Sequence, residues 1–223
     1  MTVDPQTRTI FATNTYPQVV GQDLSLFPTS ANGNATPYYF TGTPFGAAIG
    51  LAINSAGNLI DAHGKQDPFQ NRDNIGIDTV QPRYNESKPS LYTIHDFRAF
   101  GIAADPSTRT FFASSANGIY RLHENTINTV NDHTLKPAPV SIIDDKCAGP
   151  LAVAPGYLPD TYALHPGGTN GCSATPAVYV YYNRADGDVK PCRVLSGPAT
   201  GLNAPAGIYV GMLHRRNPYE QGL

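Results

Sequence analysis

The 223-residue sequence contains no tryptophan, two methionines and three cysteines, and charged residues make up only 14% of it. Its 15 Lys and Arg residues are balanced by 17 Asp and Glu, so it lacks the basic excess that phosphate contacts require, and we expect no nucleic-acid partner. Because no run reaches about 18 apolar residues, we expect no membrane-spanning helix. Residues 1–5 have neither the basic nor the apolar region of a secretion signal.

Glycine and proline, with 21 and 20 residues, are too frequent for long helices and too evenly spread for collagen. The apolar content of 40% still permits a folded core. A surface rich in Thr, Asn and Tyr but poor in charge suits strands joined by turns. The composition therefore predicts an all-β protein.

The cysteines are Cys147, Cys172 and Cys192. They form no C-x-x-C pair and have no histidine at zinc-ligand spacing, so we expect neither a metal centre built on them nor a bound cofactor. Two interpretations stay open. One is a disulfide between Cys172 and Cys192 with the third thiol unpaired, and the other is three separate buried thiols.

An internal repeat of about 50 residues organises the chain. Four short segments fall into one column, and each starts with Gly or Pro followed by small apolar residues: 50–54, 101–105, 150–154 and 207–210. A second match is closer, since residues 4–12 (DPQTRTIFA) return as residues 105–113 (DPSTRTFFA). Such agreement is hard to obtain by chance and indicates tandem units.

Each unit reads as four short strands. A buried apolar run is followed by a turn, a β-branched and aromatic strand, an alternating strand and a Gly/Asn/Asp hairpin into an outer strand. Four strands in about 50 residues are typical of a propeller blade. We therefore predict a single β-propeller domain over residues 1–223, with units at 1–49, 50–100, 101–149, 150–206 and a partial unit at 207–223.

Three stretches carry a resemblance to a known family. Residues 50–59 (GLAINSAGNL) resemble the opening of an NHL-type repeat, and residues 178–191 and 24–37 resemble the outer-strand half of such repeats in secreted microbial proteins of the NHL/YVTN type. The resemblance implies a β-propeller and an extracellular or periplasmic location, and it implies no single activity. The intervals 63–73 and 155–175 depart from the pattern, and we interpret them as loop insertions.

Four complete units and one further strand leave the closure of the ring open. In one hypothesis the ring is compact and four-bladed, with residues 207–212 paired beside residues 7–13. In the other it is a partial propeller that closes by homo-oligomerisation or belongs to a longer chain. An open ring would leave strand edges and apolar blade faces in water.

Candidate site residues come from two groups. His63 and His165 follow the first strand of their units at similar offsets, so both are predicted to face one rim and to contribute to binding. Asp186 and Asp188 are weak calcium candidates because carboxylates in a turn suit a hard cation, and the adjacent pair Asp144 and Asp145 has the same chemistry. The Asp186 turn also fits ordinary hairpin geometry without any metal.

Tyrosines suggest the ligand class. Tyr38, Tyr39, Tyr181 and Tyr182 are candidate stacking platforms for a carbohydrate or a peptide, although such residues also fill the wedge between blades. No nucleophile elbow and no nucleotide loop is present. The sequence therefore favours a non-catalytic scaffold that binds a protein or carbohydrate partner through rim loops. The alternative is a propeller enzyme, a lactonase-type hydrolase or a quinone-dependent sugar oxidoreductase, with its site at the central channel.

Overall fold

The computed structural model describes residues 2–4, 8–13, 24–39, 48–55, 57, 59–63, 74–79, 90–95, 99–124, 141–154, 160–168, 172–182 and 184–210. Their regular structure is antiparallel strand, apart from single 3-10 turns such as η2 (Pro198–Thr200). None of the helical turns in these ranges has the length and apolarity needed to span a membrane. The predicted all-β class is confirmed.

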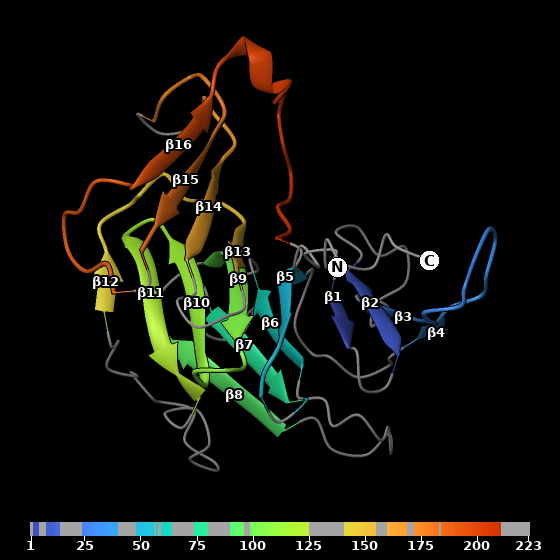
Figure 1. Cartoon of the computed structure of the whole chain (residues 1–223). Helices are drawn as coiled ribbons and strands as arrows, with labels where there is room; N and C mark the ends of the chain where they lie inside the picture. The colour runs from blue at the N-terminus through green and yellow to red at the C-terminus, as the bar shows by residue number, and fades with distance from the viewer. Residues whose placement is uncertain are drawn as a thin grey trace, which may run out of the picture.

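The strands form four successive groups, which we call blades 1 to 4 (Figure 1). Blade 1 contains β1 (Thr2–Asp4), β2 (Thr9–Thr13), β3 (Leu24–Pro28) and β4 (Tyr38–Tyr39). Blade 2 contains β5 (Ala48–Ile53), β6 (Leu59–His63), β7 (Asn74–Thr79) and β8 (Ser90–His95). Blade 3 contains β9 (Ala99–Asp105), β10 (Thr110–Ser115), β11 (Gly118–His123) and β12 (Ser141–Ile143). Blade 4 contains β13 (Leu151–Val153), β14 (Thr161–His165), β15 (Ala177–Tyr181) and β16 (Arg193–Ser196).

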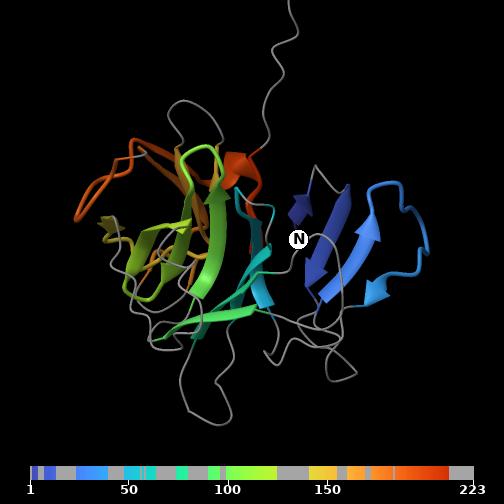
Figure 2. The ribbon, with the colours of Figure 1, turned by 90° about the horizontal axis from the view of Figure 1, so that it is seen from below.

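Blades 1, 3 and 4 are four-stranded antiparallel sheets in which each strand pairs with the next along the chain. In blade 2 the hydrogen-bonded pairs are β5 with β6 and β7 with β8, and β6 packs beside β7. The end-on view in Figure 2 places blade 1 on one side and blades 2 to 4 on the other, with the N-terminus near the middle. This up-and-down order is that of propeller blades.

The repeat is visible in the backbone as well as in the sequence. Arg8 and Arg109 share a left-handed φ of 53°, although neither is glycine. Each carbonyl accepts a hydrogen bond of 2.9 Å from the residue after the third strand, Thr29 in blade 1 and Glu124 in blade 3. In blade 3 the carboxylate of Asp105 accepts from the Ser107 amide at 3.0 Å and so holds the turn. Asp105 is therefore a turn residue whose own side chain accepts from the backbone that follows it.

Glycine in the repeat column is explained by close approach of the innermost strands. A Cβ at Gly101 would lie 2.7 Å from the Cα of Pro150, and a Cβ at Gly50 would lie 3.1 Å from the amide nitrogen of Ile102. Both contacts are with backbone of the next blade, which cannot swing aside. At Gly50 in β5 and Gly101 in β9, the close approach of the neighbouring backbone therefore disfavours a larger side chain.

Two apolar clusters join the blades. The first lies between blades 2 and 3 and contains Ile60, Ile102, Phe111 and Leu122 among its members. The second lies between blades 3 and 4, and its buried residues are Ala103, Phe112, Ile119, Ile143, Ala148, Leu151, Val153, Ala163 and Tyr181. The core of this protein is thus divided among the joints between sheets, as a row of stacked repeats requires.

One loop prediction is wrong. Strand β14 lies within the interval 155–175, which the sequence had assigned to an insertion, and Ala163 and Leu164 in it are 0% and 1% exposed. The added residues precede and follow this strand, so the strand moved out of register with the repeat. For the interval 63–73, only His63, the last residue of β6, lies within the described residues.

Pairing of residues 207–212 with residues 7–13 is not seen in the part of those segments that the structure describes. Residues 207–210 carry no strand, and β1 and β3 are the neighbours of β2. Residues 211 and 212 lie outside the described ranges. Ile208 nevertheless returns to the innermost strands, as the cavity below shows.

Candidate functional site

A cavity of about 340 Å³ lies where the innermost strands meet. Its lining comes from every unit of the repeat: β1, β5, β9, β13 and the segment 208–210. Leu51, Ile102, Leu151 and Ile208, which share one column of the sequence repeat, all line it. These innermost segments therefore face one axis, and the cavity lies where a propeller fold predicts its central channel.

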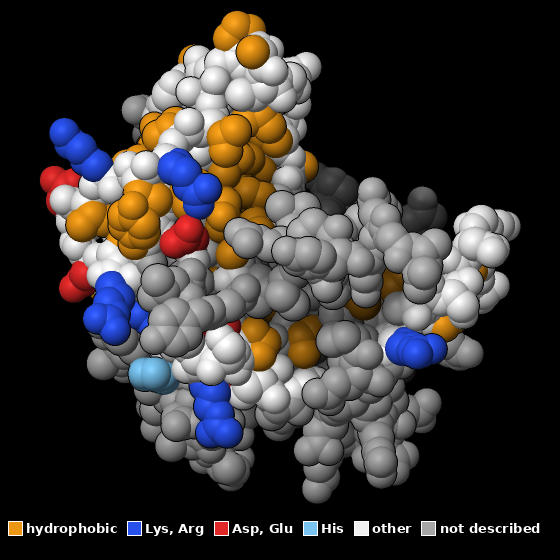
Figure 3. Space-filling model, viewed as in Figure 1, with side chains coloured by type: hydrophobic (Ala, Val, Ile, Leu, Met, Phe, Trp, Pro, Cys, Tyr) orange, Lys and Arg blue, Asp and Glu red, His pale blue; other side chains and the backbone are white. Residues whose placement is uncertain are grey.

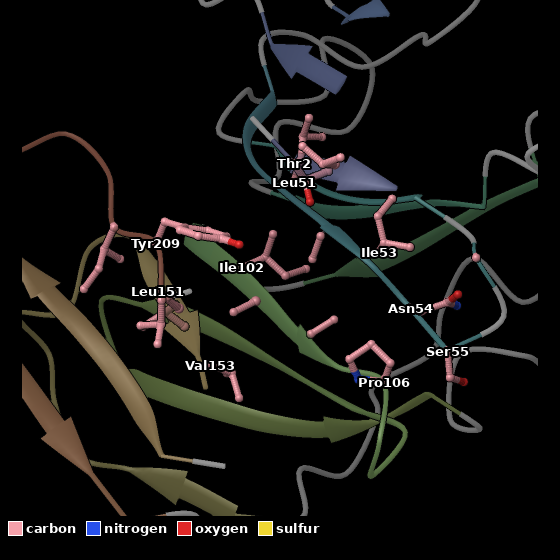
Figure 4. A pocket seen from close by; sticks show the side chains of 18 residues that line it. Thr2, Leu51, Ile53, Asn54, Ser55, Ile102, Pro106, Leu151, Val153 and Tyr209 are labelled. Carbon is pink, nitrogen blue, oxygen red and sulfur yellow. The ribbon is translucent and has the colours of Figure 1, made fainter. Parts of the chain in front are cut away.

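The chemistry of this axial cavity is mainly apolar. Figure 4 shows the side chains of Leu51, Ile102 and Tyr209, from three different segments, around one space. Tyr209 is 89% exposed, whereas Ile102 is 4% exposed. Polar atoms come from Thr2, Asn54 and Ser55, and the 18 lining residues that the structure describes include no Asp, Glu, His, Cys, Lys or Arg. A space of this size and lining suits an apolar or aromatic group.

A second constellation is polar and buried. Asp145, in the connection between β12 and β13, accepts a hydrogen bond at Oδ2 from His165 Nε2 at 2.8 Å and another from the Tyr181 hydroxyl at 2.7 Å. Its Oδ1 accepts from the Cys147 amide at 3.1 Å. The three residues are 8%, 7% and 3% exposed. We call Asp145, His165 and Tyr181 the buried triad.

Electrostatics keep the triad's carboxylate ionised. Burial raises the pKa of Asp145, but the hydrogen bonds from His165 and Tyr181 outweigh it, and the net pKa lies below its usual range. Burial and the hydrogen bond to Asp145 raise the pKa of the Tyr181 phenol above its ordinary value. At neutral pH the triad therefore contains a carboxylate that accepts from a neutral phenol and from Nε2 of His165.

The connection that carries Asp145 has further attachments. Cys147 forms a disulfide with Cys172, in the connection between β14 and β15, with the two Cα atoms 5.8 Å apart. The Gly149 amide donates to Leu164 O at 2.8 Å, and its carbonyl accepts from the Ser114 hydroxyl. The disulfide considered from the sequence, between Cys172 and Cys192, is not formed, and Cys192 is a free thiol. The spacing of the cysteines along the sequence does not show that the fold brings Cys172 next to Cys147.

The predicted binding residues are distributed unevenly. His165 and Tyr181 are brought together inside the protein, where both donate to Asp145. The ring of His165 also lies against that of Tyr179, with the two centroids 4.0 Å apart. Tyr182 is 69% exposed, on the next position after β15. Tyr38 and Tyr39 form the outer strand of blade 1 and His63 ends β6, and their side chains lie outside the described set.

The calcium candidates have other roles in the described structure. Asp186 accepts a hydrogen bond from the Ile142 amide at 2.9 Å, and Asp144 lies 3.8 Å from the Lys146 ammonium. Asp188 is exposed. Within the ranges that the structure describes, no group of three or more His, Cys, Asp or Glu residues is arranged to hold a metal ion.

Sequence reasoning missed Glu124. This carboxylate is 5% exposed and accepts a hydrogen bond at 2.8 Å from the Ser55 amide and another from the Ser55 hydroxyl, which join blade 3 to blade 2. Glu124 occupies the position of Thr29 in the repeat, so no repeated acidic residue marks it. Its one sequence signal is an acidic residue directly after a strand otherwise rich in apolar positions.

No family model and no curated protein matches the sequence. Among solved structures, the chain is similar to a quinonprotein alcohol dehydrogenase-like protein from Bacteroides thetaiotaomicron, at 15% identity and a TM-score of 0.54, over 85% of this chain and 44% of that one. It is also similar to the WD40 repeats of RRP9, at 14% identity and a TM-score of 0.45, over 81% and 49% of the two chains. The chain spans about half of the length of the proteins it matches.

The likeness to the first of these proteins and the order of the strands show the same fold. This is an all-β chain with the architecture of a β-propeller, built from four-stranded antiparallel blades around an axial cavity. At this level of sequence identity the likeness supports a shared fold and no shared function.

Proposed function

We propose that this chain is a non-catalytic binding propeller that recognises a protein partner by taking an apolar side chain into the axial cavity. The observation that carries the proposal is the cavity itself, about 340 Å³, lined by apolar side chains from all five repeat units. Ligand sites in proteins begin at about this volume and are mostly apolar with a few polar groups. Asn54, Ser55 and Thr2 supply such groups here.

The chemistry of the cavity lining also distinguishes the two predicted ligand classes, protein and carbohydrate. A carbohydrate ligand would need polar partners for its hydroxyls, and the described lining offers few, so we propose a peptide segment rather than a glycan. The exposed ring of Tyr209 is the place where either ligand would stack. The enzyme alternative has no observation in its favour among the described lining residues.

Trp fluorescence gives the test, because the protein itself contains no tryptophan. N-acetyltryptophanamide and a library of Trp-containing peptides serve as probes, with a glycan array in parallel. We expect a blue-shifted, saturable signal with the wild type and its loss in Ala152→Met, which fills the cavity. Ala199→Met, in the exposed turn η2, is the matched control. Glycan binding without peptide binding, or a signal unchanged in Ala152→Met, contradicts the proposal.

We further propose that the protein works outside the cytoplasm. The disulfide between Cys147 and Cys172 supports this location, because such bonds persist in oxidising compartments. Thiol labelling of the protein in fractions of its native cells tests it. Recovery from the medium or the periplasm with one free thiol is the expected result, and recovery from the cytoplasm with three is the contrary one.

A further inference from the structure

The outer edge of blade 3 is covered by a turn from blade 4. The Gly187 amide donates to Ile142 O at 2.6 Å, and the Asp144 amide donates to Gly187 O at 3.0 Å. The Asp186 carboxylate accepts from the Ile142 amide at 2.9 Å. One Asp-Gly turn thus satisfies the backbone groups of β12 that would otherwise form a free sheet edge.

Among the residues that the structure describes, no turn covers the equivalent edge of blade 4. All four residues of β16 are exposed, and the apolar side chains of Val194 and Leu195 are 49% and 54% exposed. In the part of the chain that the structure describes, β16 pairs with β15 alone. Figure 3 shows apolar side chains gathered over the upper part of the molecule, where blade 4 lies in Figure 1. A strand of this kind pairs readily with another chain.

Blade 1 carries a turn that matches the one on β12. Residues 31–37 (ANGNATP) align with residues 185–191 (ADGDVKP). Ala31 N donates to Pro28 O and Ala185 N donates to Tyr182 O, both at 2.9 Å. Gly33 and Gly187 have left-handed φ values of 56° and 71°. The two turns therefore have the same local backbone.

Within the described part of the chain, the turn of blade 1 covers no strand edge, whereas the turn of blade 4 covers β12. Asn32, Gly33 and Asn34 are exposed, and a Cβ at Gly33 would meet nothing within 4 Å. Within the described residues, neither the amide nor the carbonyl of Gly33 forms a hydrogen bond. The side-chain oxygen of Asn32 can accept from an amide, as the carboxylate of Asp186 does.

We propose that the Asn32-Gly33 turn of one copy of this chain docks on the β16 edge of a second copy. The occupant is a second copy because one chain carries both halves of a contact whose geometry already exists between blades 3 and 4. In a two-fold dimer the contact occurs twice, so blade 1 of each copy follows blade 4 of the other and the ring closes. The matched propeller, of which this chain spans 44%, is of the size that two copies would build.

Light scattering during size-exclusion chromatography tests the dimer, whose mass is twice 23.9 kDa. Asn32→Lys removes the acceptor and should raise the dimer dissociation constant about tenfold. Asn32→Asp makes the turn identical to residues 186–187 and should leave the dimer intact. Asn117→Lys, at the exposed tip between β10 and β11, introduces the same charge elsewhere and should change nothing.

Hydrogen exchange locates the contact. We expect those amides of residues 193–196 that do not bond to β15 to be slowed in concentrated protein and to exchange fast after dilution or in Asn32→Lys. A wild type that is monomeric at about 100 μM overturns the proposal. A dimer that Asn32→Lys leaves intact, and in which these amides of residues 193–196 exchange fast, overturns it as well. Since the three variants keep the axial cavity, peptide binding there is measured independently of the outcome.

Discussion

The joint between blades 2 and 3 and the joint between blades 3 and 4 are built differently from the same repeat. Both contain an apolar cluster. The first adds one polar link, from the Glu124 carboxylate to Ser55. The second adds the buried triad, the disulfide of Cys147 and the turn that covers β12. The repeat thus supplies the apolar surfaces, and each joint acquires its own polar fastening.

The triad and the disulfide, which fasten blade 4 to blade 3, both involve one short segment. Residues 144–150 connect blade 3 to blade 4. Asp145 holds this segment to strands β14 and β15, and Cys147 holds it to the connection between them. A segment outside regular strands has no ladder of hydrogen bonds to fix it. We infer that the triad and the disulfide set the position of blade 4 relative to blade 3. The position of blade 3 relative to blade 2 is set by apolar packing.

The largest expected effect is that of Asp145→Ala. The change leaves the buried Nε2 of His165 and hydroxyl of Tyr181 without their acceptor, so the free energy of unfolding should fall by about 4 kcal/mol. Urea unfolding followed by circular dichroism measures it. Asp144→Ala, at an exposed neighbour, should cost less than about 0.5 kcal/mol. Equal costs for the two variants would remove the triad from the account of this joint.

Loss of the disulfide comes next. Replacing both Cys147 and Cys172 by serine opens a loop of sequence separation 25, and such a loop predicts a loss of about 3 kcal/mol. Cys192→Ser, which replaces a free thiol, should cost less than about 1 kcal/mol. The midpoint of thermal unfolding with and without reductant gives an independent measure. A reductant effect that persists in the double variant would argue against this pairing.

At the other joint, Glu124→Ala should cost about 2 kcal/mol, because the Ser55 amide and hydroxyl both lose the carboxylate that accepts their partly buried hydrogen bonds. Glu124→Gln keeps one carbonyl oxygen and should recover about half of the loss. A double-mutant cycle with Ser55→Ala isolates the hydroxyl's share. If the two single changes add without coupling, the hydroxyl's hydrogen bond contributes nothing to this joint, and if Glu124→Ala costs nothing either, the whole link is excluded.

The fold was predictable because the sequence pattern that produces each blade is repeated. The column of Leu51, Ile102 and Leu151 recurs at a nearly constant spacing, and residues recurring in this way occupy equivalent strands. The prediction failed at β14, where residues inserted on both sides broke the period. Periodicity identifies an element only while the spacing holds.

The contacts between polar groups were not predictable because they are not repeated along the sequence. Asp145 accepts hydrogen bonds from His165 and Tyr181, 20 and 36 residues away, and the described residues hold no second copy of this triad. His165 was selected as a rim residue from its offset, and the structure places it inside instead. Offsets along the chain fix the strand on which a residue lies but leave open whether its side chain faces a ligand or a neighbouring blade.

The smallest effect concerns pH and sharpens the comparison of the two joints. Because the pKa of Asp145 is lower in the folded protein, its ionised form stabilises the fold above the ordinary carboxyl pKa of about 4. That contribution is lost as the pH falls from about 4 through the folded-state pKa. The difference in unfolding free energy between the wild type and Asp145→Asn should therefore shrink between pH 5 and pH 2, as urea unfolding at each pH will show. Val194→Ala, which removes no ionisable group, should give a difference that stays level over the same range. A constant difference for Asp145→Asn as well would mean that the carboxylate's charge plays no part in holding blade 4.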